Sequence, residues 1–277
     1  MEHDFAQSIR GLEQVYSVNL SVFDDEFLRK SFVRSSALTG IQQPSLYLEH
    51  LKTDAEAAES YFRSLYITYT QFFRDPLLFA YLEHRVIPNL IHQMKKDSEI
   101  RVWSAGCATG QEAYSLAILF DEQLKAANKG IRLRIFATDV SEHALAIANN
   151  GAYAAFDMQN VRLKHVQAYF VESGGQYTVT NEIRSPISFS RYDLLEAGSA
   201  NPPDSIFGNF DLVCCNNLLM YYKKEIRMFI LQKIERSLSP TGVLTVSEAE
   251  RAFIKNSTDF QPVSTPVAVF HKPGYLV

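Results

Sequence analysis

The sequence predicts an α/β fold in which a doubly wound, mainly parallel sheet follows a helical N-terminal region and carries a small β-hairpin insertion. From about residue 97 onward, apolar runs alternate with helical stretches, which is the pattern of consecutive βαβ units. Before residue 97 no alternating strand pattern occurs, and apolar residues recur at helical spacing. The chain therefore divides into a helical part and a sheet-forming part.

Residues 1–66 are predicted to form a helical domain. In FDDEFLRKSFVRSSALTG (residues 23–40) the apolar side chains have helical periodicity, and Gly40 is a suitable stop for the helix. The segment PSLYLEHLKTDAEAAESYFRSLYI (residues 44–67) predicts one or two further helices. Residues 67–96 are expected to be a linker and the start of the domain that follows.

Residues 97–277 are predicted to form the sheet domain, because short apolar runs and amphipathic segments alternate there. The expected strands are IRVWSA (100–105), IRLRIFATD (131–139), PISFSRYD (186–193), FDLVCCNN (210–217) and GVLTVSE (242–248). The expected helices are EAYSLAILFDEQLKAAN (112–128), SEHALAIANN (141–150, ended by Gly151) and KKEIRMFILQKIERSL (223–238, stopped by Ser239-Pro240 and Gly242).

Two hairpins complete the prediction. Gly174-Gly175 lies between alternating residues in YFVESGGQYTVT (169–180), which predicts a β insertion at about residues 168–183, outside the main sheet. Near the C-terminus, FQPVS (260–264) and AVFHKP (268–273) are able to pair as a second hairpin.

Composition excludes several classes of protein. The net charge of −4 and the pI near 6.0 argue against a general nucleic-acid binder, a class that usually shows a basic excess. No apolar run is long enough for membrane insertion, and MEHDFAQSIR lacks a signal-peptide pattern. The three cysteines do not form a disulfide framework, so we expect a cytoplasmic protein. No residues have metal-ligand spacing, so we expect no metal.

The segment RVWSAGCATGQEAYS (residues 101–115) marks a candidate binding site. Gly106 and Gly110 follow the first strand, where a backbone without Cβ atoms can approach a ligand closely. Their G-x-x-x-G spacing matches neither the dinucleotide fingerprint nor a P-loop. Glu112, in the first turn of the next helix, would repel a pyrophosphate but suits a ligand that carries an amino group.

A second acidic residue narrows the ligand class. Asp139 ends the second strand, where a carboxylate accepts hydrogen bonds from both hydroxyls of a ribose. With Glu112 it suits a nucleoside that has a cationic amino-acid tail, namely S-adenosylmethionine. The alternative is that Glu112 and Asp139 cap helices and that the glycines merely turn the chain.

Four blocks of sequence resemble the chemotaxis receptor glutamate methyltransferases, the CheR family. They are YTQFFRD, RVWSAGCATGQEAYSLA, FATDVSEHALAIANNGAY and FDLVCCNNLLMYY, in the family's order from about residue 60 to about 250, with the hairpin inserted among them. The resemblance implies a Rossmann-like class I methyltransferase sheet in residues 97–277. It implies methyl transfer from S-adenosylmethionine to glutamate side chains in a receptor's helical cytoplasmic region, with S-adenosylhomocysteine as the product.

The resemblance also implies two catalytic residues. Arg74 of QFFRD lies at the cofactor's methyl group in the family, where its guanidinium would hold the acceptor carboxylate in a fixed plane. Tyr221 matches a family tyrosine whose hydroxyl would orient the nucleophile. The alternatives are a surface ion pair of Arg74 with Asp75 or a neighbouring residue, and a tyrosine packed at a helix start.

Further cofactor contacts are implied on the loop before Arg74 and after the third strand. Thr70 matches a family threonine, whereas Thr68 replaces a family asparagine and loses an amide. Asp193 and Leu194 match positions that flank the adenine, although Leu194 is also a candidate core residue.

After the fourth strand, Asn217 matches a family asparagine, and Asn216 stands where the family usually has arginine. Asn216 is shorter and uncharged, which removes a charged contact beside the site and bears on the choice of substrate. Both residues are expected to bind the cofactor.

The expected partner is a methyl-accepting chemoreceptor or a similar helical signalling protein, bound by a monomer. In the family the helical domain binds the receptor through a basic helix. Here the basic residues Arg29, Lys30 and Arg34 lie close to the acidic residues Asp24, Asp25 and Glu26. A solvated helix face is therefore an equal alternative. The loop ESGGQ is too short to predict a strong peptide tether. Two other functions remain open: a methyltransferase with a different acceptor, and a non-catalytic S-adenosylmethionine-binding signalling scaffold.

Overall fold

The computed structural model describes residues 2–41, 43–263 and 266–273 of the chain. These residues belong to two compact units. The first unit comprises Met1–Ile67 and Leu218–Met228, and the second comprises Thr68–Asn217 and Phe229–Val277. The first unit thus includes a short segment from far along the chain, which the linear pattern of the sequence does not predict.

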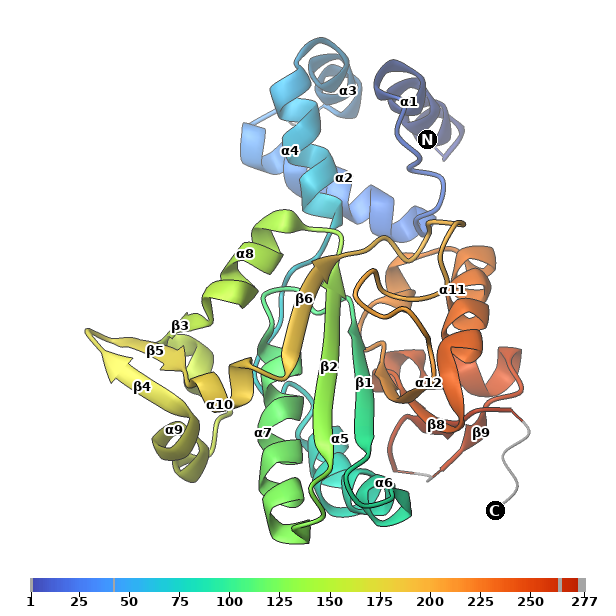
Figure 1. Ribbon diagram of the computed structural model, residues 1–277. Coiled ribbons are helices and arrows are strands. Elements are labelled where there is room, and N and C mark those ends of the chain that lie inside the picture. The colour runs from blue at the N-terminus through green and yellow to red at the C-terminus, as the bar shows by residue number, and fades with distance from the viewer. Residues whose placement is uncertain (1, 42, 264–265, 274–277) are drawn as a thin grey trace. The chain divides into compact units, whose positions relative to one another are not determined.

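The first unit is built from helices (Figure 1). They are α1 (Glu2–Tyr16), α2 (Asp25–Thr39), α3 (Pro44–Thr53), α4 (Ala55–Leu65) and the short turn η3 (Leu219–Tyr221). Asp24 caps α2 by accepting hydrogen bonds from the backbone N–H groups of Glu26 and Phe27. At the other end of α2, Gly40 has φ = 75° and closes the helix, as predicted.

The second unit contains a seven-stranded sheet with the order β6-β2-β1-β7-β8-β10-β9. Its strands are β1 (Glu99–Ala105), β2 (Arg132–Asp139), β6 (Ile187–Arg191), β7 (Phe210–Cys214), β8 (Leu238–Thr245), β9 (Gln261–Pro262) and β10 (Val269–His271). The first five of these pair in parallel, whereas β10 is antiparallel to both β8 and β9. The order reverses at β1, so the switch point of a doubly wound sheet lies between β1 and β7.

Helices cover both faces of this sheet, α7 and α8 on one side and α12 on the other (Figure 1). The helices of the unit are α5 (Pro76–Tyr81), the π-helical turn η1 (Leu82–Val86), α6 (Ile87–Gln93), α7 (Gln111–Ala127), α8 (Glu142–Asn150), α10 (Asn181–Arg184) and α12 (Glu248–Ser257). Helix α11 (Lys224–Ser237) begins in the first unit and ends in the second. The core between α5–α7 and the sheet is apolar and fully buried, which fixes the ends of the strands in space.

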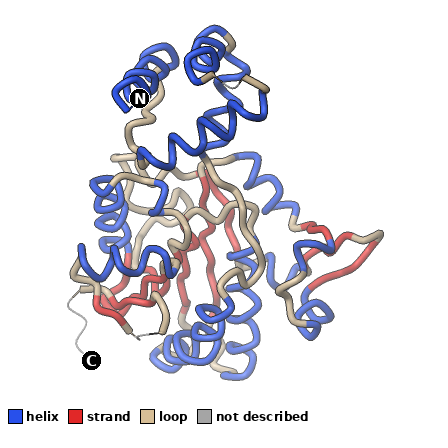
Figure 2. The backbone as a smooth tube through the Cα atoms, turned by 180° about the vertical axis from the view of Figure 1, so that it is seen from behind, coloured by secondary structure: helices blue, strands red, loops and turns tan. Residues whose placement is uncertain are grey.

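The inserted hairpin consists of β4 (Phe170–Ser173) and β5 (Gln176–Val179), which pair in antiparallel register. Gly174 and Gly175 have φ values of 58° and 80°, the left-handed conformation that a two-residue hairpin turn needs. A third strand, β3 (Ala152–Ala154), pairs with β5, and Figure 2 shows this small sheet projecting beside the large one. The turn η2 (Ala155–Met158) and helix α9 (Leu163–Tyr169) connect β3 to the hairpin.

The structure adds detail to two segments. Residues 67–96, expected to be a linker and the start of the sheet domain, contain α5, η1 and α6, whose apolar residues, such as Leu82 and Ile87, are buried in the core. Strand β8 begins at Leu238, although Pro240 was expected to lie in a break. The pairing of β7 with β8 shifts register between Phe210 and Leu212, and this irregularity tolerates a residue without an N–H group.

Candidate functional site

The candidate cofactor-binding residues all lie in the second unit, on the loop that precedes α5 or at or just beyond the carboxyl ends of β1, β2, β6 and β7. They are Thr68, Thr70, Arg74, Gly106, Glu112, Asp139, Asp193, Leu194, Asn216 and Asn217. The carboxyl ends of parallel strands share one edge of the sheet, which is where open α/β sheets bind their ligands.

The glycine-rich turn after β1 has an unusual backbone. Gly106, Ala108 and Gly110 have φ values of 77°, 48° and 92°. A Cβ atom at Gly110 would lie 2.9 Å from the Cβ atom of Ala148 in α8, so this glycine allows α8 to pack against the turn. The expectation that both glycines make room for a ligand thus needs refinement, because Gly110 makes room for a helix.

Glu112 lies in the first turn of α7 and is held at both oxygens. Its Oε1 accepts a hydrogen bond from the Ser104 hydroxyl at 2.6 Å, and its Oε2 accepts one from the Asn216 amide at 2.8 Å. Burial raises the pKa of Glu112, and the two hydrogen bonds and the charge of Arg74 oppose this rise. Glu112 forms no ion pair within the described residues, so it is a partly buried carboxylate that a cationic group would stabilise.

Asp139 also has both oxygens engaged. Its Oδ2 accepts a hydrogen bond from the Ala108 N–H and its Oδ1 accepts one from the Ser141 N–H, each at 2.9 Å. Burial raises the pKa of Asp139, against the effect of these backbone donors. The carboxylate therefore stabilises the left-handed Ala108, and each oxygen keeps a lone pair that can accept a ribose hydroxyl.

Arg74 is partly buried at the end of the loop formed by residues 68–74. Its Nη1 donates to the carbonyl oxygen of Tyr69 at 3.0 Å, and its guanidinium lies 5.1 Å from the centre of the Tyr69 ring. The alternative of an ion pair with Asp75 is not realised, because that carboxylate accepts the Leu78 N–H and caps α5. Among the described residues Arg74 has no acidic partner at ion-pair distance, although its charge acts on Glu112.

Asp193 and Leu194 follow β6. Asp193 is exposed and accepts a hydrogen bond from the Leu195 N–H at 2.8 Å, whereas Leu194 is buried. On the loop before Arg74, Thr68 is exposed and Thr70 is partly buried.

Asn216 and Asn217 follow β7. The Asn216 side chain binds Glu112 and also accepts a hydrogen bond from the Thr245 hydroxyl at 3.3 Å. Asn217 has φ = 57°, and its N–H donates to the buried carboxylate of Glu250 at 3.0 Å. The neutral side-chain amide of Asn216 thus links Glu112 to Thr245.

Tyr221, the second catalytic candidate, belongs to the first unit. Its ring lies 4.9 Å from that of Phe27, and its carbonyl oxygen accepts the Asp24 N–H at 2.9 Å. The neighbouring Tyr222 is buried and stacks on Phe23, which agrees with the expectation that it is a packing residue.

Two supporting residues were not predicted from the sequence: Ser104, which donates to Glu112, and Thr245, which donates to Asn216. Ser104 and Thr245 are buried polar residues inside strands β1 and β8, and the only available signal is a hydroxyl in an otherwise apolar run. The expectation that cysteine takes no part in chemistry fits the structure. Cys107, Cys214 and Cys215 are buried, and burial raises the pKa of each thiol far above its ordinary value.

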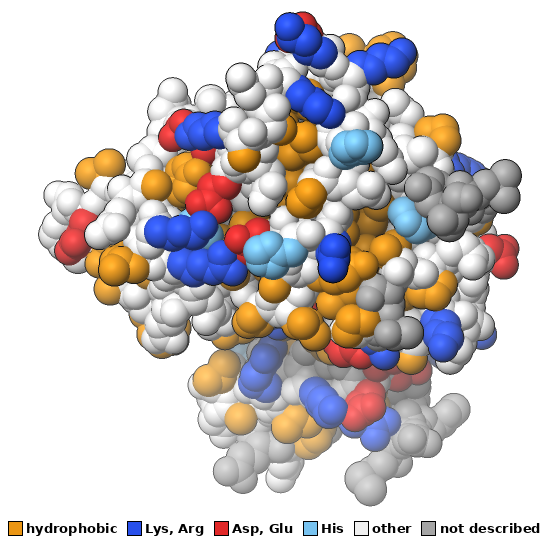
Figure 3. Space-filling view, turned by 90° about the horizontal axis from the view of Figure 1, so that it is seen from below, with side chains coloured by type: hydrophobic (Ala, Val, Ile, Leu, Met, Phe, Trp, Pro, Cys, Tyr) orange, Lys and Arg blue, Asp and Glu red, His pale blue; other side chains and the backbone are white. Residues whose placement is uncertain are grey.

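The opposite edge of the sheet has a different character. A hollow of about 390 Å³ lies there, and Figure 3 shows that apolar side chains on this face are mixed with histidines and cations. It is lined by Tyr81, His84, Arg85, Val86, Pro88, Asn89, Leu90, Gln93, Thr241, Val243, Val263 and His271. None of the candidate site residues lines it.

The site fits S-adenosylmethionine on the chemistry of its acceptors. Glu112 offers a carboxylate, without a partner cation in the described chain, to the amino group of the ligand. Asp139 offers lone pairs to the ribose hydroxyls. None of the described helices has the length and apolar character needed to cross a bilayer, and no group of acidic, histidine and cysteine side chains among the described residues is arranged to hold a metal ion.

Comparison with known proteins places this site within a matched domain. The family model described as CheR methyltransferase, SAM binding domain, matches residues 68–269. Its start coincides with that of the second unit, at Thr68.

Two relatives and one solved structure illustrate the similarity. The chain is 34% identical to the 104.1 kDa protein in the hypE 3' region of Rhodobacter capsulatus over 93% of this chain, but it spans only 26% of that protein. It is 28% identical to a chemotaxis protein methyltransferase of Listeria innocua, with 94% of both chains covered. The magnesium protoporphyrin IX methyltransferase of Synechocystis PCC 6803 is 17% identical over 76% of this chain and 87% of its own, with a TM-score of 0.37.

Proposed function

Since the chain belongs to the CheR methyltransferase family, we propose that it transfers the methyl group of S-adenosylmethionine to glutamate side chains of chemoreceptor cytoplasmic regions, forming methyl esters. The observation that carries this proposal is Arg74. It is a partly buried guanidinium whose charge acts on Glu112 and which has no acidic partner among the described residues. Such a cation is suited to hold an incoming carboxylate.

The proposed reaction requires little proton transfer by the protein. When bound, the cofactor supplies a methyl group activated by its attachment to a sulfonium. A glutamate carboxylate is already ionised at neutral pH and needs no general base. Arg74 would hold it in one plane, Glu112 would bind the cofactor's amino group, and Asp139 would bind its ribose.

The other candidate residues complete this assignment. We assign Thr68, Thr70, Gly106 and Asn217 to the surroundings of the cofactor, and Asp193 and Leu194 to its adenine. Asn216 would act on the cofactor through Glu112, to which its amide is bonded. Tyr221 would donate a hydrogen bond that orients the acceptor carboxylate.

The finer parts of the proposal concern the partner. The relatives named chemotaxis protein methyltransferases support a methyl-accepting chemoreceptor, or a similar helical signalling protein, as the acceptor. We propose that the helical domain, residues 1–66, reads this partner, and that the chain acts as a monomer in the cytoplasm. Lys30, one of the cations of α2, is paired with Glu26 at 2.7 Å, so we expect it to contribute little.

The test is transfer of radiolabel from S-adenosylmethionine to cytoplasmic fragments of the chemoreceptors. Label that mild base releases as methanol marks a carboxyl ester. We expect Arg74→Ala to abolish the transfer and Arg132→Ala to leave it unchanged, because Arg132 is exposed at the opposite end of β2. Binding of S-adenosylmethionine without labelling by the wild-type chain would favour another acceptor or a non-catalytic scaffold.

A further inference from the structure

The residue before Arg74 has a strained backbone. Phe73 has φ = 49°, in the left-handed region that a bulky residue without a turn-forming side chain rarely adopts. Its ring is buried, whereas the next side chain, that of Arg74, is only partly buried. The strained turn therefore separates a core side chain from the candidate catalytic cation, and strain of this kind persists only where neighbouring residues enforce it.

A serine of α7 holds the backbone of this turn. The N–H of Phe73 donates to the hydroxyl oxygen of Ser115 at 3.1 Å, and this hydroxyl in turn donates to the carbonyl oxygen of Gln111 at 2.7 Å. Ser115 is fully buried, so water does not compete for these bonds. Because Ser115 lies three residues after Glu112, its hydroxyl joins the Arg74 loop to the helical turn that carries the acid.

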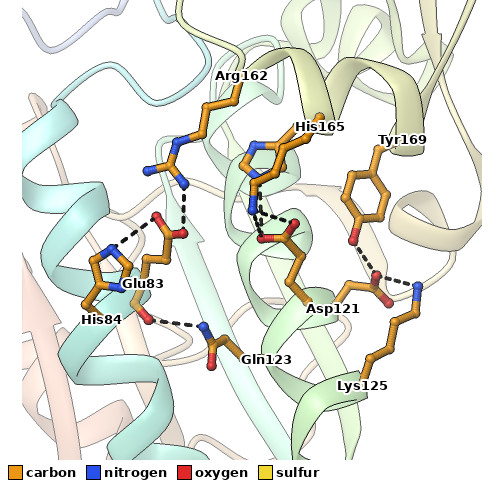
Figure 4. A network of polar contacts seen from close by, with 10 residues as sticks. Glu83, His84, Asp121, Gln123, Lys125, Arg162, His165 and Tyr169 are labelled. Atoms are coloured by element: carbon orange, nitrogen blue, oxygen red, sulfur yellow. Dashed lines mark hydrogen bonds and ion pairs between the residues drawn. The ribbon is translucent and has the colours of Figure 1, made fainter.

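A histidine of α9 holds the ring. The Phe73 ring stacks on His165 with 5.5 Å between ring centres and an angle of 27°, and it meets Phe79 edge-on at 5.3 Å. His165 is buried, and its Nε2 lies 3.3 Å from a carboxylate oxygen of Glu122 in α7. Figure 4 shows His165 among the polar contacts that join α9 to α7, so the surface on which Phe73 rests is fixed.

We propose that Ser115 and His165 are positioning residues: through the left-handed turn at Phe73 they hold Arg74 in the orientation that methyl transfer requires. The proposal rests on the proposed role of Arg74 as the cation that holds the acceptor. Neither residue is close to Arg74 in sequence, and Ser115 lies 42 positions from Phe73. Orientation matters here because a small misplacement of a group that aligns the reactants is costly in rate.

The test compares Ser115→Ala with Ser237→Ala. Ser237 is a buried serine whose hydroxyl also binds a carbonyl within its helix, that of Ile234, so its replacement is a matched control. In the labelling assay we expect Ser115→Ala to lower kcat roughly tenfold. We expect the affinity for S-adenosylmethionine, measured by calorimetry, to change less than about twofold, because Ser115 bonds Phe73 and Gln111 and none of the residues assigned to the cofactor. Equal activity of the two serine variants would overturn the proposal.

A double-mutant cycle shows whether Ser115 acts through Arg74. In the background of Arg74→Lys, Ser115→Ala should lower kcat much less than in the wild type, because the group it positions is already compromised. Fully additive losses, or a parallel loss of cofactor affinity, would indicate a merely structural role and contradict the proposal. If Ser115→Ala does not fold, His165→Leu takes its place in the same cycle. It tests the turn at Phe73 by removing the side chain on which the Phe73 ring stacks.

A wrong assignment of the acceptor can be distinguished from a wrong role for Ser115. If the wild-type chain labels no receptor fragment, the acceptor is wrong, and the positioning proposal is then judged by amide hydrogen exchange in the free protein. We expect the Phe73 amide to exchange at least tenfold faster in Ser115→Ala and to be unaffected in Ser237→Ala. Unchanged protection of Phe73 in Ser115→Ala would contradict it.

Discussion

The side-chain amide of Asn216 donates a hydrogen bond to Oε2 of Glu112 at 2.8 Å. With the Ser104 hydroxyl on Oε1, it fixes the carboxylate between strands β1 and β7, at the switch point of the sheet. The rise in the pKa of Glu112 through burial is opposed first by this amide. Asn216 is therefore a support for the acid that we assign to the cofactor's amino group.

Replacement of Asn216 should weaken cofactor binding. In Asn216→Ala one oxygen of Glu112 loses its donor, and the carboxylate is free to turn away from the ligand. A hydrogen bond to a charged group contributes about 1.5–3 kcal/mol, so we expect the affinity for S-adenosylmethionine to fall by roughly tenfold or more. Isothermal titration calorimetry measures this. Asn149→Ala, which removes an amide that donates to the carbonyl oxygen of Leu145 in its own helix, should bind normally, and equal affinity of the two variants would contradict the role of Asn216.

Cofactor binding should depend on pH through Glu112. Burial raises the pKa of this carboxyl above its ordinary value, and the ionised form is the one that attracts an ammonium group. As the pH falls from 8 to about 5, we expect the affinity to stay constant and then decline, beginning at a higher pH than for an exposed glutamate. The Glu112→Gln variant should bind weakly throughout and lose this part of the dependence. An identical pH profile in both proteins would show that another group is responsible.

Two isosteric substitutions should change stability in opposite directions. An acid whose pKa is higher in the folded than in the unfolded chain binds protons more tightly when folded, so its ionisation at neutral pH destabilises the fold. This holds for Glu112, and a glutamine can keep the bond from Ser104 and bind a rotated Asn216 amide. We expect Glu112→Gln to raise Tm by about 2–4 °C for each kcal/mol recovered.

Asp139 has the same direction of pKa shift but different partners. Two backbone N–H groups, those of Ala108 and Ser141, need its two oxygens, and an asparagine supplies only one acceptor oxygen. One buried donor is then left facing an NH₂ group, which costs about 1–3 kcal/mol. We expect Asp139→Asn to lower Tm in scanning calorimetry without ligand. A lower Tm for Glu112→Gln, or a higher one for Asp139→Asn, would refute this account of the two acids.

Much of the fold could be predicted because its signals are local. Gly40 and Gly151 end helices in the left-handed conformation, and Gly174-Gly175 turns a hairpin, each as the sequence indicates. The apolar runs around Val102 and Ile135 became buried parallel strands. Strand β3 has three residues, too few to show an alternating apolar pattern in the sequence. It forms because it pairs with β5.

The candidate site could be predicted only in part, because its supports come from distant positions. The acids follow strands, which is a local pattern, so Glu112 and Asp139 could be named from the sequence. One of the two donors to Glu112, Asn216, lies 104 residues away, and no period or spacing connects the two residues. Likewise, nothing in the sequence around Phe73 indicates its positive φ or the hydrogen bond from its N–H to Ser115. The roles of Arg74 and Tyr221 stay predictions.

The glycine-rich turn offers a test of why a glycine is needed there. At Gly110 a Cβ atom would lie 2.9 Å from the Cβ of Ala148 and 3.2 Å from its Cα, and the residue has φ = 92°. Gly110→Ala therefore combines an unfavourable backbone with a collision against α8, and we expect it to destabilise the protein by about 2–4 kcal/mol. Because Ala108 of the same turn donates its N–H to Asp139, displacement of the turn should also weaken cofactor binding.

Gly175 is the matched control for this substitution. It has φ = 80°, close to that of Gly110, but among the described residues no atom beyond its two chain neighbours lies within 4 Å of the position of its Cβ. Gly175→Ala should therefore show the backbone cost alone, about 1–2 kcal/mol, with unchanged affinity for S-adenosylmethionine. Chemical denaturation of the two variants separates the backbone cost from the collision cost. The difference between their losses in free energy of unfolding is the cost of the collision with Ala148. Equal destabilisation would mean that the turn shifts without cost, and the packing of α8 would then not explain the glycine.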